Sequence, residues 1–167
     1  MPTPDFDAEA LYRTLAGQVT VALSGASKIA VVGIYSGGAW IAERLAAELN
    51  VQSIGYIDVS FYRDDFAEKG LPAEVKPTHI PFDVEGATVL LVDDVLYTGR
   101  TTRAAINELF DYGRPARVML AALIDRGGRE LPVAADFVAE RINLDQDQRL
   151  VLQRAEDGRF SLTVEHA

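Results

Sequence analysis

The segment Val89 to Thr102, VLLVDDVLYTGRTT, decides the fold. It runs from a short apolar stretch through two adjacent carboxylates and a glycine into a helical pattern. In an open α/β sheet, ligands bind at the carboxyl ends of strands, where loops lead into helix N-termini. The backbone N–H groups at such a helix start, with threonine hydroxyls beside them, favour a phosphate dianion. The segment therefore predicts a strand, a phosphate-binding loop and a helix.

Asp93 and Asp94 directly follow the apolar residues of this segment. Two adjacent carboxylates after a buried strand are costly unless they are solvated or bind a ligand, and one alternative is that they only cap the next turn. Their place just ahead of the phosphate loop favours a second role, holding the hydroxyls of a sugar whose phosphate lies in the loop. We predict both as catalytic residues. The predicted binding loop that follows consists of Val95, Leu96, Tyr97, Thr98, Gly99, Arg100, Thr101 and Thr102.

The rest of the chain alternates strands and helices. Apolar runs rich in β-branched residues predict strands at 28–35, 51–62, 88–93 and 117–124. Helical spacing predicts helices at 6–23, 39–50 and 101–112. Such alternation implies an α/β fold with a mainly parallel sheet and helices on both faces, because parallel neighbours need a crossover. The segments RLVLQR and RFSLTV, around the turn AEDG, predict a C-terminal β-hairpin, and we expect one domain over residues 1–167.

Composition limits the function classes. The 16 basic residues against 25 acidic ones give a net charge of −9, which disfavours nucleic acid as a partner. The chain has no cysteine and therefore no thiolate nucleophile or disulfide. We find no metal-ligand pattern, no secretory signal and no apolar run of membrane-spanning length. We therefore expect a cytoplasmic protein that makes no membrane contact.

Three segments resemble a known family. VDDVLYTGRT at 92–101 looks like the phosphoribosyl pyrophosphate signature of type I phosphoribosyltransferases. Together with IDVSFYRDD at 57–65 and IDRGGRELP at 124–132, it is similar to the PyrR family of pyrimidine operon regulators with uracil phosphoribosyltransferase activity. The match runs in order from about Leu11 to about Val138. The resemblance implies the type I phosphoribosyltransferase fold, a flexible hood loop over the site, and a homodimer or larger homo-oligomer.

The resemblance also assigns roles outside the phosphate loop. The substrates would be phosphoribosyl pyrophosphate (PRPP) and uracil, the product UMP, and the cofactor Mg²⁺ carried in with PRPP. A turn after the first strand would hold pyrophosphate, and its residues are Tyr35, Ser36, Gly37 and Gly38. The hood residues would be Tyr62, Arg63, Asp64 and Asp65. Base recognition would fall to Asp125, Arg126 and Gly127, a stretch that local sequence alone predicts only as a turn.

One departure from the family leaves the activity open. PyrR proteins usually read Thr-Arg-Gly where this chain has Ser36-Gly37-Gly38, so a guanidinium that could neutralise the leaving group is absent. On this reasoning, Gly37→Arg should raise turnover. Two alternatives to uracil transfer follow. The protein could be a non-catalytic regulator that senses nucleotides. It could also be a 6-oxopurine phosphoribosyltransferase, because Ser-Gly-Gly resembles the pyrophosphate loop of those enzymes as well.

The surface with which relatives grip messenger RNA also departs from the family pattern. Gly128, Ala134 and Glu140 stand where family members typically carry histidine, arginine and lysine. Ala16, Gly17 and Thr20 stand where relatives tend to have threonine, arginine and histidine, and Arg129 alone matches. Lys and Arg contacts to phosphates supply most sequence-independent affinity for nucleic acid. We therefore predict no RNA-binding residues and expect RNA binding to be lost.

Overall fold

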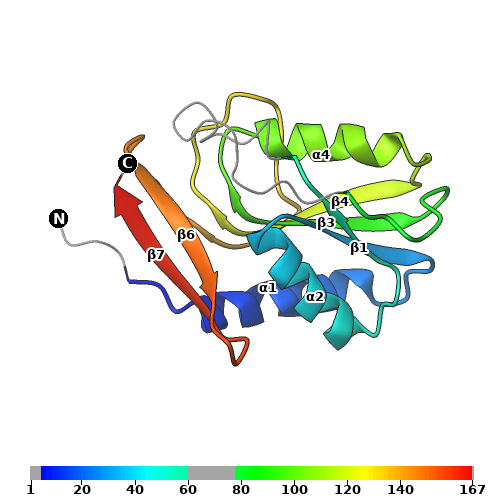
Figure 1. The fold of residues 1–167 in the computed structure, drawn as a ribbon, viewed down its shortest axis with the longest axis horizontal. Helices are drawn as coiled ribbons and strands as arrows, with labels where there is room; N and C mark the ends of the chain where they lie inside the picture. Colours follow the sequence, from blue (N-terminus) through cyan, green and yellow to red (C-terminus); the bar gives the residue numbers. More distant parts are fainter. Residues whose placement is uncertain (1–4, 60–77, 167) are drawn as a thin grey trace.

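The computed structural model describes residues 5–59 and 78–166 (Figure 1). Its helices are α1 (Ala8–Leu23), α2 (Gly37–Leu49) and α4 (Arg100–Phe110). Its strands are β1 (Ile29–Ile34), β2 (Ile54–Ile57), β3 (Thr88–Leu96), β4 (Arg117–Asp125), β5 (Phe137–Arg141), β6 (Gln148–Arg154) and β7 (Phe160–His166).

Five strands form one sheet in the order β2-β1-β3-β4-β5, and every neighbouring pair is parallel. The chain leaves β1 for β2 on one side, and β3 then pairs with the other side of β1. The direction of winding therefore reverses between β1 and β3. In open α/β sheets, this switch point is where ligands bind, because the loops that follow the two strands turn to opposite faces.

Helices cover both faces of the sheet, as predicted (Figure 1). α1 and α2 pack on one face together with Leu90 of β3, whereas α4 packs on the other face together with Leu91. Successive residues of a strand point to opposite faces, so this one apolar strand supplies both cores. The parallel sheet between helices and the C-terminal antiparallel hairpin, β6–β7, agree with the fold that the resemblance to type I phosphoribosyltransferases implies.

The strand bounds differ most from those predicted at β3 and β2, and one strand was not predicted. β3 does not end at Asp93 but continues to Leu96, because Leu96 is buried and its pairing with β4 continues as far as Asp125. β2 covers only Ile54–Ile57 of the predicted 51–62, of which 60–62 lie outside the described residues. β5 was missed because its sequence, FVAER, is short and half exposed, as edge strands often are.

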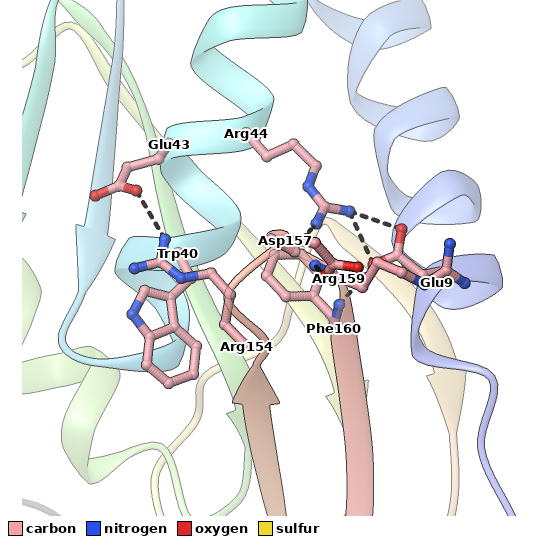
Figure 2. A pocket seen from close by; sticks show the side chains of 9 residues that line it. Glu9, Trp40, Glu43, Arg44, Arg154, Asp157, Arg159 and Phe160 are labelled. Carbon is pink, nitrogen blue, oxygen red and sulfur yellow. Dashed lines mark hydrogen bonds and ion pairs between the residues drawn. The ribbon is translucent and has the colours of Figure 1, made fainter.

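The C-terminal hairpin is fixed to α1 and α2 by one arginine (Figure 2). The guanidinium of Arg44 lies 3.8 Å from the ring centroid of Phe160 and 4.6 Å from that of Tyr12. It donates two hydrogen bonds to the carboxylate of Glu9, at 3.0 and 3.1 Å, and a third to the carbonyl of Gly158. Glu9 in turn accepts a 2.7 Å hydrogen bond from the backbone N–H of Phe160. Arg44 therefore links three elements that lie far apart in sequence.

The ionisation of Glu9 makes this link dependent on pH. Burial alone would raise the pKa of Glu9, but the hydrogen bonds from Phe160 and Arg44 outweigh it and hold the pKa below the ordinary value of 4.5. A carboxyl whose folded-state pKa is depressed stabilises the fold above its unfolded-state pKa, and this contribution is lost as the pH falls through the folded-state pKa.

We predict that Arg44→Met lowers the free energy of unfolding at pH 7 by about 2 kcal/mol, the range of charged hydrogen bonds. The difference between variant and wild type should shrink as the pH falls below 4.5, because Glu9 then becomes protonated in both. Urea unfolding at several pH values measures both effects.

The matched control is Asp83→Asn, which removes the exposed ion pair with Lys28 and should change stability by less than about 0.5 kcal/mol. If Arg44→Met is as stable as wild type at pH 7, the link does not hold the hairpin.

Candidate functional site

The predicted pyrophosphate turn and the acidic pair meet at the switch point. A Cβ atom on Gly38 would lie 2.9 Å from the Cα of Asp93 and still closer to the carbonyl oxygen of Val92. A Cβ atom on Gly37 would lie 2.8 Å from the carboxyl carbon of Asp94, and its nearest neighbour would be Oδ2 of that carboxylate. These contacts are too close for any side chain. The two glycines therefore let the first turn of α2 lie directly on β3.

Gly33 completes this close approach and was not predicted as a site residue. A Cβ atom on Gly33, within β1, would lie 2.6 Å from the Cα of Ala39 in α2. The sequence did carry a signal, because a glycine inside an apolar strand often marks a point where another backbone comes near.

Asp93 and Asp94 lie inside β3 rather than at its end. Asp93 is buried, with 7% of its surface exposed, and its Oδ1 accepts a 2.8 Å hydrogen bond from the N–H of Asp94. Oδ1 of Asp94 accepts a 2.8 Å bond from the N–H of Val95. Each carboxylate is thus fixed by the backbone that follows it. Both bonds lie within β3, so they are not the turn capping considered from the sequence, and Oδ2 of Asp94 faces the start of α2.

The loop between β3 and α4 is fixed by hydrogen bonds from the segment that follows β4. The carbonyl of Thr98 accepts hydrogen bonds from the N–H groups of Glu130 and Leu131, at 2.9 and 3.0 Å. Gly99 has φ = 95°, a conformation that favours glycine, and a Cβ atom there would lie 3.2 Å from Val133. The sequence suggested that Gly99 lets a phosphate approach. In the structure, the missing side chain also makes room for the segment around residues 131–133.

The other loop residues divide into buried and exposed side chains. Leu96 and Thr102 are buried, at 2% and 1% exposure, so their side chains are not available to a ligand at the surface. The hydroxyl of Thr98 accepts from the N–H of Arg100 at 3.2 Å. The Arg100 guanidinium is exposed and bonds to Glu130 at 3.0 Å. The N–H groups in the first turn of a helix have no partners within the helix, which leaves the start of α4 suited to an anion.

The residues predicted for base recognition lie at the end of β4, next to this loop. Asp125 pairs in register with Leu96. Arg126 is buried, and its guanidinium lies 3.9 Å from the ring centroid of Tyr97. The same guanidinium donates to the carbonyls of Gln148 and Asp145, at 2.7 and 2.9 Å. The Arg126 side chain therefore supports Tyr97 rather than projecting into open space.

Tyr35, the first residue of the predicted pyrophosphate turn, is fixed through its ring. It stacks on Tyr56 of β2 with ring centroids 5.4 Å apart, and the hydroxyl of Tyr56 donates to Glu43 of α2 at 3.3 Å. Burial and the neighbouring Glu43 carboxylate raise the pKa of Tyr56 to about 12, so its hydroxyl stays a donor at neutral pH. The peptide bond between Tyr35 and Ser36 is cis.

The structure also contains a hollow that involves none of the predicted site residues. It has a volume of about 470 Å³ and is lined by residues of α1, α2 and the hairpin, among them Trp40, Glu43 and Arg154 (Figure 2). Arg154 bonds to Glu43 at 3.0 Å there. The predicted hood residues Tyr62, Arg63, Asp64 and Asp65 lie outside the described residues.

The family pattern predicts that an arginine side chain at position 37 raises turnover. The close contact between Gly37 and Asp94 predicts the opposite result. We predict that Gly37→Ala weakens PRPP binding at least tenfold, and that Gly37→Arg does so too, because any Cβ atom would displace the Asp94 carboxylate. Titration calorimetry with PRPP and Mg²⁺ measures this.

Gly17→Ala is the matched control, since a Cβ atom on Gly17 meets nothing within 4 Å. Tighter binding or faster turnover by Gly37→Arg would show that the carboxylate moves aside at little cost.

Comparison with known proteins agrees with this architecture. Residues 7–150 match the model of the phosphoribosyl transferase domain family. A hypoxanthine-guanine phosphoribosyltransferase from Bacillus anthracis superposes with a TM-score of 0.71 at 20% identity, covering 98% of this chain and 99% of that one. A hypoxanthine phosphoribosyltransferase from Staphylococcus aureus gives a TM-score of 0.64 at 24% identity, covering 87% and 78%. At these identities, the likeness shows the fold alone.

Within the described residues, no helix is both long enough and apolar enough to span a membrane.

Much higher identity is found with proteins named bifunctional protein PyrR. The one from Ralstonia nicotianae is 54% identical over 170 residues, which cover 99% of this chain and 98% of that protein. The one from Nitrosococcus oceani is 45% identical over 168 residues, covering 97% and 95%. The chain therefore belongs to the phosphoribosyl transferase domain family and, within it, to the PyrR family.

Proposed function

We propose that this phosphoribosyltransferase transfers ribose 5-phosphate from PRPP to uracil, forming UMP and pyrophosphate. The observation that carries the proposal is the meeting of the first turn of α2 with Asp93 and Asp94 of β3, beside the loop that opens α4. Two helix starts and a carboxylate pair at a switch point suit a sugar with a phosphate group at either end. The choice of uracil rests on the resemblance of the segments at 57–65 and 124–132 to the PyrR family.

In the proposed reaction, a uracil nitrogen bonds to the anomeric carbon of the ribose while the bond from that carbon to pyrophosphate breaks. The nitrogen releases its proton to solvent, and the electrons of the broken bond leave with pyrophosphate. Positive charge builds on the sugar during this step, and the carboxylates of Asp93 and Asp94 stabilise it electrostatically. The 5-phosphate would lie at the start of α4, and the pyrophosphate at the start of α2.

Mg²⁺ fits this arrangement as an ion carried by the substrate. Carboxylate oxygens are ligands that Mg²⁺ prefers, and Asp93 and Asp94 supply them. Within residues 5–59 and 78–166, no further acidic or imidazole side chain joins them in a cluster of three. We therefore assign most ligands of the ion to substrate oxygens and water. When bound, the ion neutralises charge on the phosphates.

Base-dependent release of pyrophosphate tests the proposal. Purified protein is incubated with PRPP and Mg²⁺, with uracil or guanine as the acceptor, and pyrophosphate is measured. The proposal expects release with uracil alone. Release with guanine would instead identify a 6-oxopurine phosphoribosyltransferase. Binding of PRPP or UMP without release would identify a nucleotide-sensing regulator, the alternative raised by the absence of an arginine at Gly37.

The acidic pair provides a second test. We predict that the double variant Asp93→Asn, Asp94→Asn loses turnover at least a hundredfold while its thermal unfolding stays close to that of wild type. Asparagine keeps the oxygen that accepts each backbone hydrogen bond and removes only the charge. A variant that unfolds in the absence of ligand would show that the acids serve the core, and full activity would show that they do not act in transfer.

We also propose that RNA binding is lost, while the protein remains a cytoplasmic homodimer or larger homo-oligomer. α1 lies beside β5, and the side chain of Gln18 donates to the carbonyl of Val138 at 3.1 Å. The residues of these two elements that differ from the RNA-binding pattern of the family therefore lie on one surface. Gly17, Thr20 and Glu140 are exposed there. None of these three side chains is basic, so the positions at which the family pattern has cations supply none for binding phosphates, although Arg13 and Arg141 are exposed on the same elements.

Filter binding of a pyrimidine-operon leader, at low salt and with or without UMP, tests this loss. We expect dissociation constants above the micromolar range, as for weak non-specific binding. Saturable, sequence-specific binding at nanomolar protein would refute it.

A further inference from the structure

Arg129 is the one basic residue that matches the RNA-binding pattern of relatives, yet its side chain is turned inward. Its Nη1 donates to the carbonyl of Tyr97 at 2.6 Å, and its Nη2 donates to Oδ2 of Asp125 at 2.6 Å. One quarter of the side chain is exposed, against one tenth for that of Asp125. A guanidinium engaged at this depth by two internal acceptors is poorly placed to contact an external phosphate.

Tyr97, which receives one of these bonds, directly precedes the phosphate loop proper. Its ring is contacted at two points by the segment that contains Arg129. The Arg126 guanidinium lies 3.9 Å from the ring centroid. Gly128 also lies beside the ring, since a Cβ atom there would fall 2.9 Å from Cδ1 of the ring. Segment 126–129 therefore packs against Tyr97, and Arg129 bonds to the carbonyl that leads into Thr98.

Asp125, which receives the other bond, is the last residue of β4. Its Oδ1 accepts a 3.0 Å hydrogen bond from the N–H of Gly127, so both of its oxygens are used inside the molecule. Burial alone would raise the pKa of Asp125, but the hydrogen bonds from Arg129 and Gly127 outweigh it and hold the pKa below its ordinary value. The carboxylate thus stays charged at neutral pH, opposite Arg129. Arg129 thereby joins the carboxyl end of β3 to that of β4.

We infer that Arg129 is a positioning residue, which holds the Tyr97 carbonyl so that the N–H groups of residues 98–102 keep the orientation needed for the 5-phosphate of PRPP. The inference deepens the proposed function and rests on it for the identity of the ligand. Arg129 also connects residues 125–127, which we predict to recognise the base, to the phosphate loop. Lysine cannot replace the guanidinium, because one ammonium group does not present two separated N–H donors in a fixed plane.

Direct binding of PRPP with Mg²⁺, measured by titration calorimetry, tests the inference. Arg129→Met should weaken PRPP binding roughly tenfold to a hundredfold, the range for loss of charged hydrogen bonds. Arg129→Lys should recover little of it. Where turnover is measurable, the KM for PRPP should rise much more than kcat falls. Arg117→Met is the control, since Arg117 is exposed at the start of β4, the opposite end of that strand from Asp125.

A second variant separates positioning from stability. Arg129→Met leaves Asp125 charged and without its arginine, which can destabilise the whole fold. In the double variant Arg129→Met, Asp125→Asn, that charge is gone, and the asparagine oxygen can still accept from Gly127. The double variant should regain the thermal stability of wild type but not its affinity for PRPP. If it is stable and binds PRPP as wild type does, or if Arg129→Met alone does so, the inference is wrong.

Failure of the proposed function looks different in the same experiments. Wild-type protein that binds PRPP but releases no pyrophosphate with uracil would contradict uracil transfer and leave the role of Arg129 standing. Wild-type protein that does not bind PRPP would overturn both.

Discussion

The site depends on how closely the start of α2 can approach β3. Because winding reverses between β1 and β3, the two chain segments that follow these strands meet at one edge of the sheet. Adjacency in a sheet would still leave room for side chains between helix and strand. Gly33, Gly37 and Gly38 remove that room, and a Cβ atom at any of the three would fall within 3 Å of a neighbouring atom. The acidic pair therefore lies against the first turn of α2.

This closeness has an electrostatic consequence for a protein of net charge −9. Such a chain repels a highly anionic substrate at long range, so the attraction has to come from local groups. The starts of α2 and α4 supply partial positive charge from backbone N–H groups, which cannot be titrated. Asp93 and Asp94 lie against the start of α2 and, in the proposed reaction, would face the cationic sugar centre. The proposal thus assigns binding of phosphate and stabilisation of positive charge to different groups of one small region.

The sequence predicted the elements that regular patterns encode and missed the contacts that depend on packing between distant segments. The apolar run before Asp93, the helical spacing that ends at Asn50 and the hairpin turn after Arg154 each carry a local signal, and the structure has a strand, a helix end and a hairpin at these places. The extension of β3 to Leu96 depends on pairing with β4, which no local pattern shows. The roles of Arg126 and Arg129 depend likewise on where Tyr97 lies, so the sequence could mark these residues only through family resemblance.

The two departures at Gly37 and Gly128 have one physical explanation in this structure. Relatives carry an arginine and a histidine at these positions, and either side chain begins with a Cβ atom. At Gly37, that atom would meet the carboxylate of Asp94, and at Gly128 the ring of Tyr97. Gly128 also has φ = 73°, a conformation in which a side chain is strained. Each glycine thus makes room for a residue of the predicted site. Under the proposed function, both departures from the family pattern therefore follow from contacts that Asp94 and Tyr97 make with the backbone of this chain.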